Sequence, residues 1–221
     1  MLYDQESVEP GSAASSDALA QALDGDHEYL WIVDPIDGTT NFVHAMPLSA
    51  VSIGIADKAG NLVIGVIYDP HREEMFHAVK GCGAFLNGAP LHVGEQATLE
   101  EAVVAAGAPP TALALGPALR GITALAPKVR TMRLLGSAAI MLAWVACGRL
   151  TAYFEADLNA WDIAAGALII MEAGGHVTEG SGAPYSLATR SVVGSNSLIH
   201  SELQEVLQAA DAVAVDTEPR V

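Results

Sequence analysis

Two aspartates three positions apart, Asp34 and Asp37, close an apolar stretch in the sequence WIVDPIDGTTNF. Pro35 fixes its own φ angle and favours an extended conformation at Asp34, so the chain should leave a strand with that carboxylate at its tip. Gly38 permits a tight turn. Asp34, Asp37 and the carbonyl of Ile36 can then converge, and three oxygens at one point suit a hard cation. A capped turn without a metal also fits the Asp-x-x-Asp spacing alone.

The residues after this turn could hold an anion. Thr39 and Thr40 can cap a short helix, and the N–H groups of Gly38 and Thr39 would lie at its start. A cation site with an anion site beside it would suit a phosphate group.

A third carboxylate, Asp162, stands at the beginning of a predicted helix in AWDIAAGALIIMEAGG. The helix dipole stabilises a carboxylate at this end, so capping alone could explain it. Trp161 and the small residues that follow indicate tight burial, and a buried carboxylate needs a partner charge or a metal.

Two weaker patterns could contact a substrate. In RLLGSAA, Gly136, Ser137 and Ala138 form a glycine-led helix start that could present N–H groups to a hydroxyl or a phosphate, or could simply be an N-cap. Glu155 and Asp157 precede Asp162 and could meet a polyol, or could be solvated acids of a loop.

The overall composition limits the class of protein. The chain has 221 residues, 51% of them hydrophobic, which suits one large domain or two small ones. No apolar run reaches the ~18 residues of a membrane span, and the N-terminus lacks the pattern of a signal peptide. Cys82 and Cys147 are far apart and belong to no C-x-x-C pair. We expect a cytoplasmic protein without a membrane segment.

The charge narrows the possible partners. With 10 basic and 26 acidic residues, the chain has a formal net charge of -16. Such a surface repels nucleic acid, whose binding depends on neutralised phosphates, so direct nucleic-acid binding is not expected. A small phosphorylated substrate would also be repelled unless metal cations reversed the local sign.

The elements that must position these residues differ between the two halves. The first half has short connections and predicts an antiparallel sheet. Its predicted elements are a short helix at 15–23 and strands at 28–34, 48–57, 61–70 and 73–79. The second half alternates strands at 101–107, 150–157, 176–179 and 191–196 with helices at 110–126, 137–148, 160–175 and 197–210, which favours a layered α/β arrangement. Gly116 and Pro117 should kink or divide the helix at 110–126.

Taken together, WIVDPIDGTTNFVHAMPLSAVSIGIA and WDIAAGALIIMEAGG resemble the inositol monophosphatase family, from about residue 2 to about residue 210. Its members are Mg²⁺-dependent, typically lithium-sensitive phosphomonoesterases and often homodimers. The resemblance implies an α/β fold, α+β in its first half, built as a layered αβαβα sugar-phosphatase-like sandwich that lacks an N-terminal helix pair. We expect an N-terminal metal-site domain at 1–108 and a C-terminal α/β domain at 109–221.

The resemblance also implies roles for individual residues. Asp34, Asp37, Asp162 and the carbonyl of Ile36 would bind Mg²⁺, and Asp37 and Thr39 would be catalytic, with Thr39 helping to orient the attacking water. The substrate would contact Gly38, Thr39, Thr40, Gly136, Ser137, Ala138, Glu155 and Asp162. Glu155 would bind a ring hydroxyl, and Arg133 matches a basic residue just ahead of the glycine-led segment.

Two departures from the family pattern stand out. The family carries a Gly-Glu-Glu motif whose first glutamate binds metal, and its counterpart here is YDQES, with Gln5 at that position and Glu6 at the second. Either Glu6 or Asp4 substitutes by a slip, or one metal site is weakened. Family members also have a helix pair ahead of this motif, and we expect this chain to be N-terminally truncated relative to them.

These features predict a Mg²⁺-dependent phosphatase that hydrolyses inositol monophosphate or a similar sugar or polyol phosphate. Histidinol phosphate and fructose 1,6-bisphosphate are alternative substrates, because shape-reading loops decide the identity of the leaving group. A catalytically impaired regulatory or binding homologue is the alternative from another class, and Gln5 and the expected truncation favour it.

Overall fold

The computed structural model describes residues 1–9, 11–109, 111–212 and 214–215, and it contains two sheets and the helices around them. Sheet A has the strand order β1-β2-β3-β4-β5-β6-β7. Its strands are β1 (Leu2–Asp4), β2 (Tyr29–Asp37), β3 (Ala50–Asp57), β4 (Leu62–Asp69), β5 (Glu74–Val79), β6 (Ala84–Leu86) and β7 (Ala89–Pro90). Neighbouring strands are antiparallel as predicted, except that β1 pairs with β2 in parallel.

Sheet B has the strand order β11-β12-β10-β8-β9. Its strands are β8 (Val103–Ala106), β9 (Thr131–Arg133), β10 (Ala152–Glu155), β11 (His176–Glu179) and β12 (Val192–Ser195). Strand β8 runs parallel to β9 and β10, whereas β12 is antiparallel to β10 and β11.

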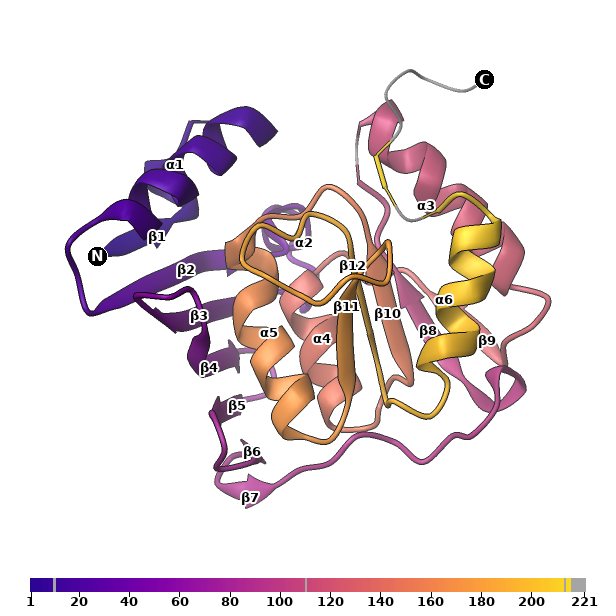
Figure 1. Ribbon diagram of the computed structural model, residues 1–221. Helices are drawn as coiled ribbons and strands as arrows, with labels where there is room; N and C mark the ends of the chain where they lie inside the picture. The colour runs from indigo at the N-terminus through magenta and orange to yellow at the C-terminus, as the bar shows by residue number, and fades with distance from the viewer. Residues whose placement is uncertain (10, 110, 213, 216–221) are drawn as a thin grey trace.

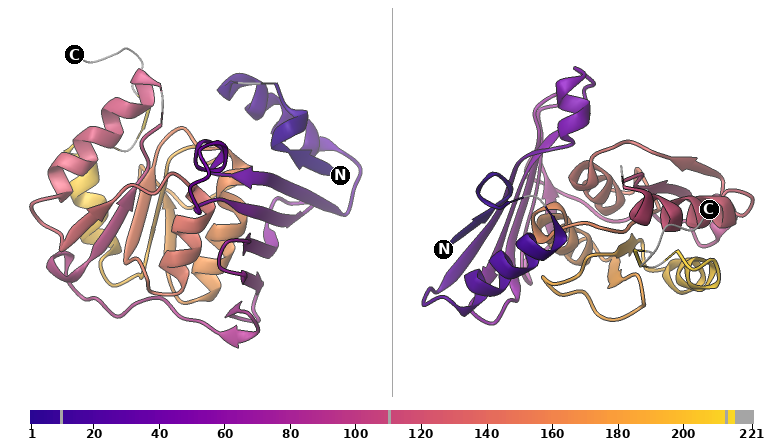
Figure 2. Two further views of the ribbon diagram at one scale, coloured as in Figure 1. Left: turned by 180° about the vertical axis from the view of Figure 1, so that it is seen from behind. Right: turned by 90° about the horizontal axis from the view of Figure 1, so that it is seen from above.

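The helices lie in layers between and beside the sheets (Figures 1 and 2). They are α1 (Ser12–Asp24), α2 (Thr39–Val43), α3 (Ala112–Leu125), α4 (Ala138–Ala146), α5 (Ala160–Glu172) and α6 (His200–Ala209), with 3₁₀ turns at Gln5–Ser7 and Leu99–Glu101. Helices α4 and α5 pack between sheet A and sheet B, and α3 and α6 cover the other face of sheet B. This arrangement confirms the predicted layered α/β fold.

The sandwiched helices α4 and α5 are apolar on nearly every side because a sheet or a helix faces each side. One core fills the space between sheet A, these two helices and sheet B, and a second lies between sheet B, α3 and α6. Since α5 belongs to the second half of the chain but packs on sheet A, the halves interlock. The division at residue 108 stays a prediction.

Two details differ from the sequence prediction. Helix α3 is not divided at Pro117, because its buried residues 114, 117, 118, 121 and 125 follow the helical repeat and form one continuous packed face. Helix α4 ends at Ala146 with Cys147 as its C-cap, two residues before the predicted end at 148, and Gly148 follows with a left-handed φ of 74°. Among the described residues, none of the helices has the length and apolar character needed to cross a membrane.

Candidate metal centre

A bulge in β2 turns Asp34 and Asp37 towards the same side. Residues three apart on a regular strand point to opposite faces. Here the register with β3 shifts between the two aspartates, and the extra residue of the bulge cancels the mismatch. The strand therefore continues to Asp37, instead of ending at Asp34 as the sequence predicted.

The turn after the bulge requires glycine at position 38. Gly38 has a φ of 83°, and a Cβ there would lie 2.8 Å from the carbonyl oxygen of Leu48 and 3.1 Å from the Cβ of Ser137. Helix α2 starts directly after it. The glycine thus lets the turn lie flat against the start of α4.

Small residues bring Asp162 to the end of β2. A Cβ on Gly65 would lie 2.6 Å from the carbonyl oxygen of Ala165, and one on Gly54 would lie 2.8 Å from the Cβ of Ala164. Helix α5 therefore rests almost directly on the backbones of β3 and β4. Figure 1 shows its N-terminal end beside the C-terminal end of β2.

The three aspartates form a compact cluster. Asp34, Asp37 and Asp162 each offer a carboxylate oxygen, and these oxygens lie within 4.8 Å of one another. Asp34 and Asp37 are buried, whereas Asp162 is partly exposed, so the cluster opens to solvent on that side. It is the one such group of three acids, cysteines or histidines among the residues that the structure describes.

Hydrogen bonds orient each carboxylate. Asp34 Oδ1 accepts the N–H of Ile36 at 2.9 Å. Asp162 Oδ2 accepts the N–H of Asn159 at 2.7 Å, which caps α5. On the third carboxylate, Oδ2 of Asp37 accepts the N–H of Ala139 at 3.0 Å and also the hydroxyl of Ser137.

Burial and mutual repulsion raise the pKa values of the acids. Burial, followed by the charge of Asp37, raises the pKa of Asp34 to about 7. Burial raises the pKa of Asp37 to about 6, and the hydrogen bond from Ser137 limits the rise. The pKa of Asp162 also lies well above the usual range, because of burial and then the charge of Asp37. A bound cation would reverse these shifts.

The residues present fit a hard divalent cation. Asp34 Oδ2 is buried and has no hydrogen-bond partner among the described residues, and neither has the buried Oε1 of Gln5. A buried carboxylate oxygen without a partner is costly unless a cation compensates it. The available atoms are all oxygens, which favours Mg²⁺ or a similar hard ion over soft metals.

The other predicted site residues lie around this cluster in different states. Thr39 donates its hydroxyl to the carbonyl of Ile36 at 3.0 Å, and Thr40 is exposed. Glu155 ends β10 and accepts the hydroxyl of Tyr153. Burial raises its pKa to about 7, and the charge of Asp37 adds to the rise. Glu155 thus shares the electrostatic environment of the cluster.

The glycine-led segment at 136–138 leads into the start of α4, which donates hydrogen bonds to Asp37. Gly136 is exposed with a φ of 75°, and Ser137 caps α4 through the N–H of Ile140 at 3.2 Å. Both Ala138 and Ala139 direct their N–H groups to Asp37, so these donors are engaged within the protein. The sequence left two interpretations of Gly136, Ser137 and Ala138 open, N–H groups that face a substrate or an N-cap formed by Ser137, and the structure shows the N-cap.

Of the other residues that the sequence singled out, Asp4 and Arg133 form hydrogen bonds away from the cluster, whereas Glu6 is exposed. Asp4 accepts the N–H and the hydroxyl of Ser7 at 3.1 and 2.7 Å. Glu6 is exposed, and its charge contributes to the raised pKa of Asp34. Arg133 donates to its own strand, at 2.6 Å to the hydroxyl of Thr131.

One positioning residue escaped the sequence analysis. Asn41 is buried, and its Nδ2 donates to the carbonyls of Leu48 and Leu135 at 2.8 and 2.7 Å. A Cβ on Gly136 would lie 3.1 Å from this amide. Asn41 therefore holds the glycine-led segment against the metal-site turn, and its place in DGTTNF was the available signal.

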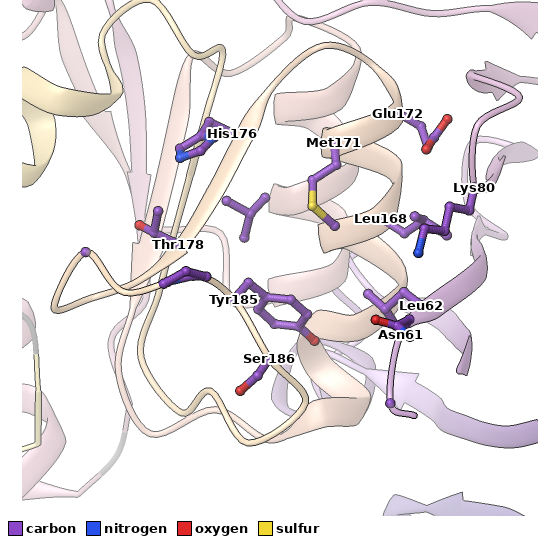
Figure 3. Close-up of a pocket in the computed structure, with 14 residues that line it drawn as sticks. Asn61, Leu62, Lys80, Leu168, Met171, Glu172, His176, Thr178, Tyr185 and Ser186 are labelled. Atoms are coloured by element: carbon purple, nitrogen blue, oxygen red, sulfur yellow. The ribbon is translucent and has the colours of Figure 1, made fainter. Parts of the chain in front are cut away.

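A separate cavity of about 430 Å³ lies at the opposite end of α5 (Figure 3). Leu168 and Met171 of α5, His176 of β11 and Tyr185 line part of it. The carboxylate of Glu172 there accepts the N–H groups of the turn at 81–83 at 2.8 and 2.9 Å. The cavity includes none of the three clustered aspartates.

Comparison with known proteins agrees with the fold. The model of the inositol monophosphatase family matches residues 3–214. Inositol monophosphatase 3 of Solanum lycopersicum is 44% identical over 172 residues, which are 76% of this chain and 64% of the relative. A protein of Thermotoga maritima named fructose-1,6-bisphosphatase/inositol-1-monophosphatase is 39% identical over 178 residues, 80% of this chain and 67% of the relative.

A solved structure shows the same architecture. The IMPase structure from Thermotoga maritima superposes with a TM-score of 0.79 at 37% identity, covering 85% of this chain and 71% of that one. This chain spans about two thirds of the length of the two curated relatives, 64% and 67%.

Proposed function

Because this chain belongs to the inositol monophosphatase family, we propose that it hydrolyses inositol monophosphate or a similar sugar or polyol phosphate with the help of Mg²⁺. The observation that carries the proposal is the cluster of Asp34, Asp37 and Asp162, in which a buried oxygen of Asp34 has no partner among the described residues. Three acids that concentrate negative charge in one place would repel a phosphate unless cations were bound there.

We assign the metal ligands to Asp34, Asp37, Asp162 and the carbonyl of Ile36, with Gln5 and Glu6 as further candidates. Magnesium held there supplies the positive charge that offsets a phosphate group and the charge developing during its transfer. The carboxylates accept hydrogen bonds from the N–H groups of Ile36, Ala139 and Asn159, and these bonds orient them before the ion binds.

The remaining roles belong to groups around the cluster. The Thr39 hydroxyl donates to Ile36 O, which leaves its lone pairs to accept a hydrogen bond from the attacking water. The N–H groups of Gly38 and Thr39, with Thr40, would contact the phosphate. Gly136, Ser137 and Ala138 would border the substrate, and Glu155 would accept a hydrogen bond from a ring hydroxyl.

Fructose 1,6-bisphosphate is the second candidate substrate. The Thermotoga maritima relative carries both activities in its name. A second phosphate would add negative charge beside a chain of net charge -16, and the single arginine of RLLGSAA, Arg133, is turned to its own strand. We therefore place inositol monophosphate first.

Further properties of the family accompany the proposal. We propose inhibition by lithium, assembly as a homodimer and a cytoplasmic location, all on the family resemblance. Inhibition of phosphate release by lithium chloride, with sodium chloride at equal ionic strength as the control, tests the first of these.

Phosphate release from inositol 1-phosphate, fructose 1,6-bisphosphate and histidinol phosphate, with and without Mg²⁺, tests the function. We expect Mg²⁺-dependent turnover that is fastest with inositol 1-phosphate and is lost in Asp37→Asn. Faster release from one of the other two would replace the substrate assignment. Magnesium binding without release from any of them would favour a binding role, and unchanged turnover in Asp37→Asn would overturn the site.

A further inference from the structure

The first turn of α5 carries Asp162, and three separate segments hold it in place. The hydroxyl of Ser52 on β3 donates to the carbonyl of Trp161 at 3.1 Å. The ring of Tyr3 on β1 packs on the ring of Trp161 with centroids 4.9 Å apart. The third segment is the loop that leads from β11 to β12, and it contributes Arg190.

Arg190 joins two parts of the chain to the loop before α5. Its Nη2 donates to Asp157 Oδ1 at 2.7 Å, and its Nη1 donates to the side-chain oxygen of Asn159. The same Nη1 donates to the hydroxyl of Ser15 on α1 at 2.9 Å. The carbonyl of Arg190 accepts the N–H of Leu158 at 2.9 Å. Both the backbone and the side chain of one residue therefore clasp residues 157–159.

The clasped loop requires such support. Asp157 has a φ of 65°, a left-handed conformation that residues other than glycine adopt only at a cost. Asn159 is the N-cap of α5, and its N–H is the donor that fixes Asp162 Oδ2. A shift of Asn159 would thus rotate the carboxylate of Asp162 away from its place in the cluster.

Arg190 also faces a cavity between the N-terminal segment and the start of α5. It lines a cavity of about 340 Å³ together with Gln5 and Trp161. Its side chain is 28% exposed and is paired with Asp157. The guanidinium therefore lies between α1 and α5, next to the position at which the sequence suggested a further metal ligand.

We propose that Arg190 is a positioning residue for the metal site: by bridging Ser15, Asp157 and Asn159, it sets the orientation of Asp162. The proposal rests on the proposed metal-binding function. Arginine suits this task because its planar fork can bond several acceptors at once, whereas lysine offers a single flexible donor point. Helix α1 is then coupled to the metal site through Ser15, although it contributes none of the three clustered acids.

Magnesium titration by calorimetry tests the proposal in the intact protein. We expect Arg190→Ala to weaken Mg²⁺ binding about tenfold, as is typical when a residue that orients a ligand is lost. Arg190→Lys should recover part of the affinity. Arg149→Ala is the matched control, because Arg149 is also a partly exposed arginine in an ion pair, with Glu74 at 2.6 Å, but its hydrogen bonds go to Glu74 and not to the loop at 157–159 that Arg190 holds.

Amide hydrogen exchange of the metal-free proteins gives a readout that does not depend on the function. In Arg190→Ala, the N–H groups of residues 158–162 should exchange faster, while those of α4 remain protected; Arg149→Ala should leave residues 158–162 unchanged. Unchanged exchange there in Arg190→Ala would overturn the proposal whether or not the protein binds metal.

The combined results separate the two hypotheses. Faster exchange with unchanged Mg²⁺ affinity would show that Arg190 orders the loop without setting the metal site, which also overturns the proposal. Failure of the unmodified protein to bind Mg²⁺ would overturn the proposed function and, with it, the assignment of Arg190 to a metal site. Faster exchange with weaker binding supports both.

Discussion

Two Asp-Pro turns lie at the same edge of sheet A and have opposite characters. Asp34-Pro35 interrupts β2 near its end, and Asp69-Pro70 follows β4, which runs in the same direction because β3 is antiparallel to both strands. Asp34 is 1% exposed and Asp69 is 0% exposed. In each turn the aspartate Oδ1 accepts the N–H two residues on, at 2.9 Å.

The turns differ in the residue that lies three positions after the aspartate of the Asp-Pro pair. After Asp69 this residue is Arg72, whose Nη1 donates to Asp69 Oδ2 at 2.8 Å. After Asp34 it is another acid, Asp37, and Asp34 Oδ2 has no partner within the described part of the chain. The same local frame therefore makes a satisfied structural ion pair in one place and an uncompensated acid cluster in the other.

Exchanging each buried aspartate for asparagine should break the comparison most strongly. Asp34→Asn should reduce turnover about 1,000-fold, because the Mg²⁺ that would stabilise the transition state loses a charged ligand. Asp69→Asn should leave turnover almost unchanged but cost about 2 kcal/mol of stability, since it breaks a largely buried pair. Phosphate release and urea unfolding measure the two effects.

The stability of the metal-free protein should change in opposite directions in the two variants. Asp34→Asn should stabilise the metal-free protein at pH 8, because it removes a buried charge without a partner. An equal loss of turnover in both variants, or a destabilised metal-free Asp34→Asn, would contradict the distinction between the turns.

The pH dependence of stability should separate the turns next. Asp34 has a pKa of about 7 in the folded protein against 3.8 ordinarily, so the folded state binds its proton more tightly than the unfolded state. Stability of the metal-free protein should therefore fall as pH rises from about 4 to about 7, by roughly 3 kcal/mol. Saturating Mg²⁺ should flatten this slope. Thermal unfolding at pH 5 and pH 7.5, with and without Mg²⁺, measures the change.

Two variants serve as controls for the pH effect. Asp34→Asn should reduce the slope of the metal-free protein, whereas Asp69→Asn should retain it. A metal-free protein whose stability rises between pH 5 and pH 7.5 would show that burial does not raise the pKa values of the clustered acids as inferred.

A smaller effect should follow from adding a fourth acid to the set of candidate metal ligands. Gln5→Glu places a carboxylate where a buried amide oxygen has no partner among the described residues. We expect about tenfold tighter Mg²⁺ binding, because affinity rises with the charge of the ligands. The metal-free variant should be less stable at pH 8 than the parent. Calorimetric titration measures the affinity, and no gain would place Gln5 outside the metal-binding set.

Much of this site could be predicted from sequence because its key residues are local. The turn chemistry of Pro35 and Gly38 lies within a few residues of Asp34 and Asp37. The Asp-x-x-Asp spacing alone also fitted a metal-free turn, and the longer sequence around it indicated the cation site. Asp162 follows from its place at a helix start. Strand and helix periodicity, with the family resemblance, predicted the layered fold.

The remaining features depend on contacts between distant residues. Periodicity cannot place the β2 bulge, because a bulge is defined by the register with β3. Asp37 takes its hydrogen bonds from Ser137 and Ala139, about a hundred positions away, and Arg190 reaches Asp157 across 33 positions. None of these pairings has a sequence spacing that reveals it.

Arg72→Asp should have the smallest effect on function, and it sharpens the comparison by copying the acid pair of the other turn. The change removes the ion pair with Asp69 and the stacking of Arg72 over Trp144, whose centroid lies 5.1 Å away. We expect a loss of about 2 kcal/mol in urea unfolding and turnover close to that of the parent. Calorimetry should find no additional bound Mg²⁺.

The physical reason is that two acids in a turn are not sufficient. At the metal site, α5 places a third carboxylate, Asp162, beside the two acids of the turn, and close contacts between glycines of sheet A and alanines of α5 allow this approach. Beside the Asp69 turn, the carboxylate of Glu74 is already held by both terminal nitrogens of Arg149 at 2.6 Å. An additional Mg²⁺ bound by Arg72→Asp would mean that the turn alone makes the site and that delivery of Asp162 by the helix is dispensable.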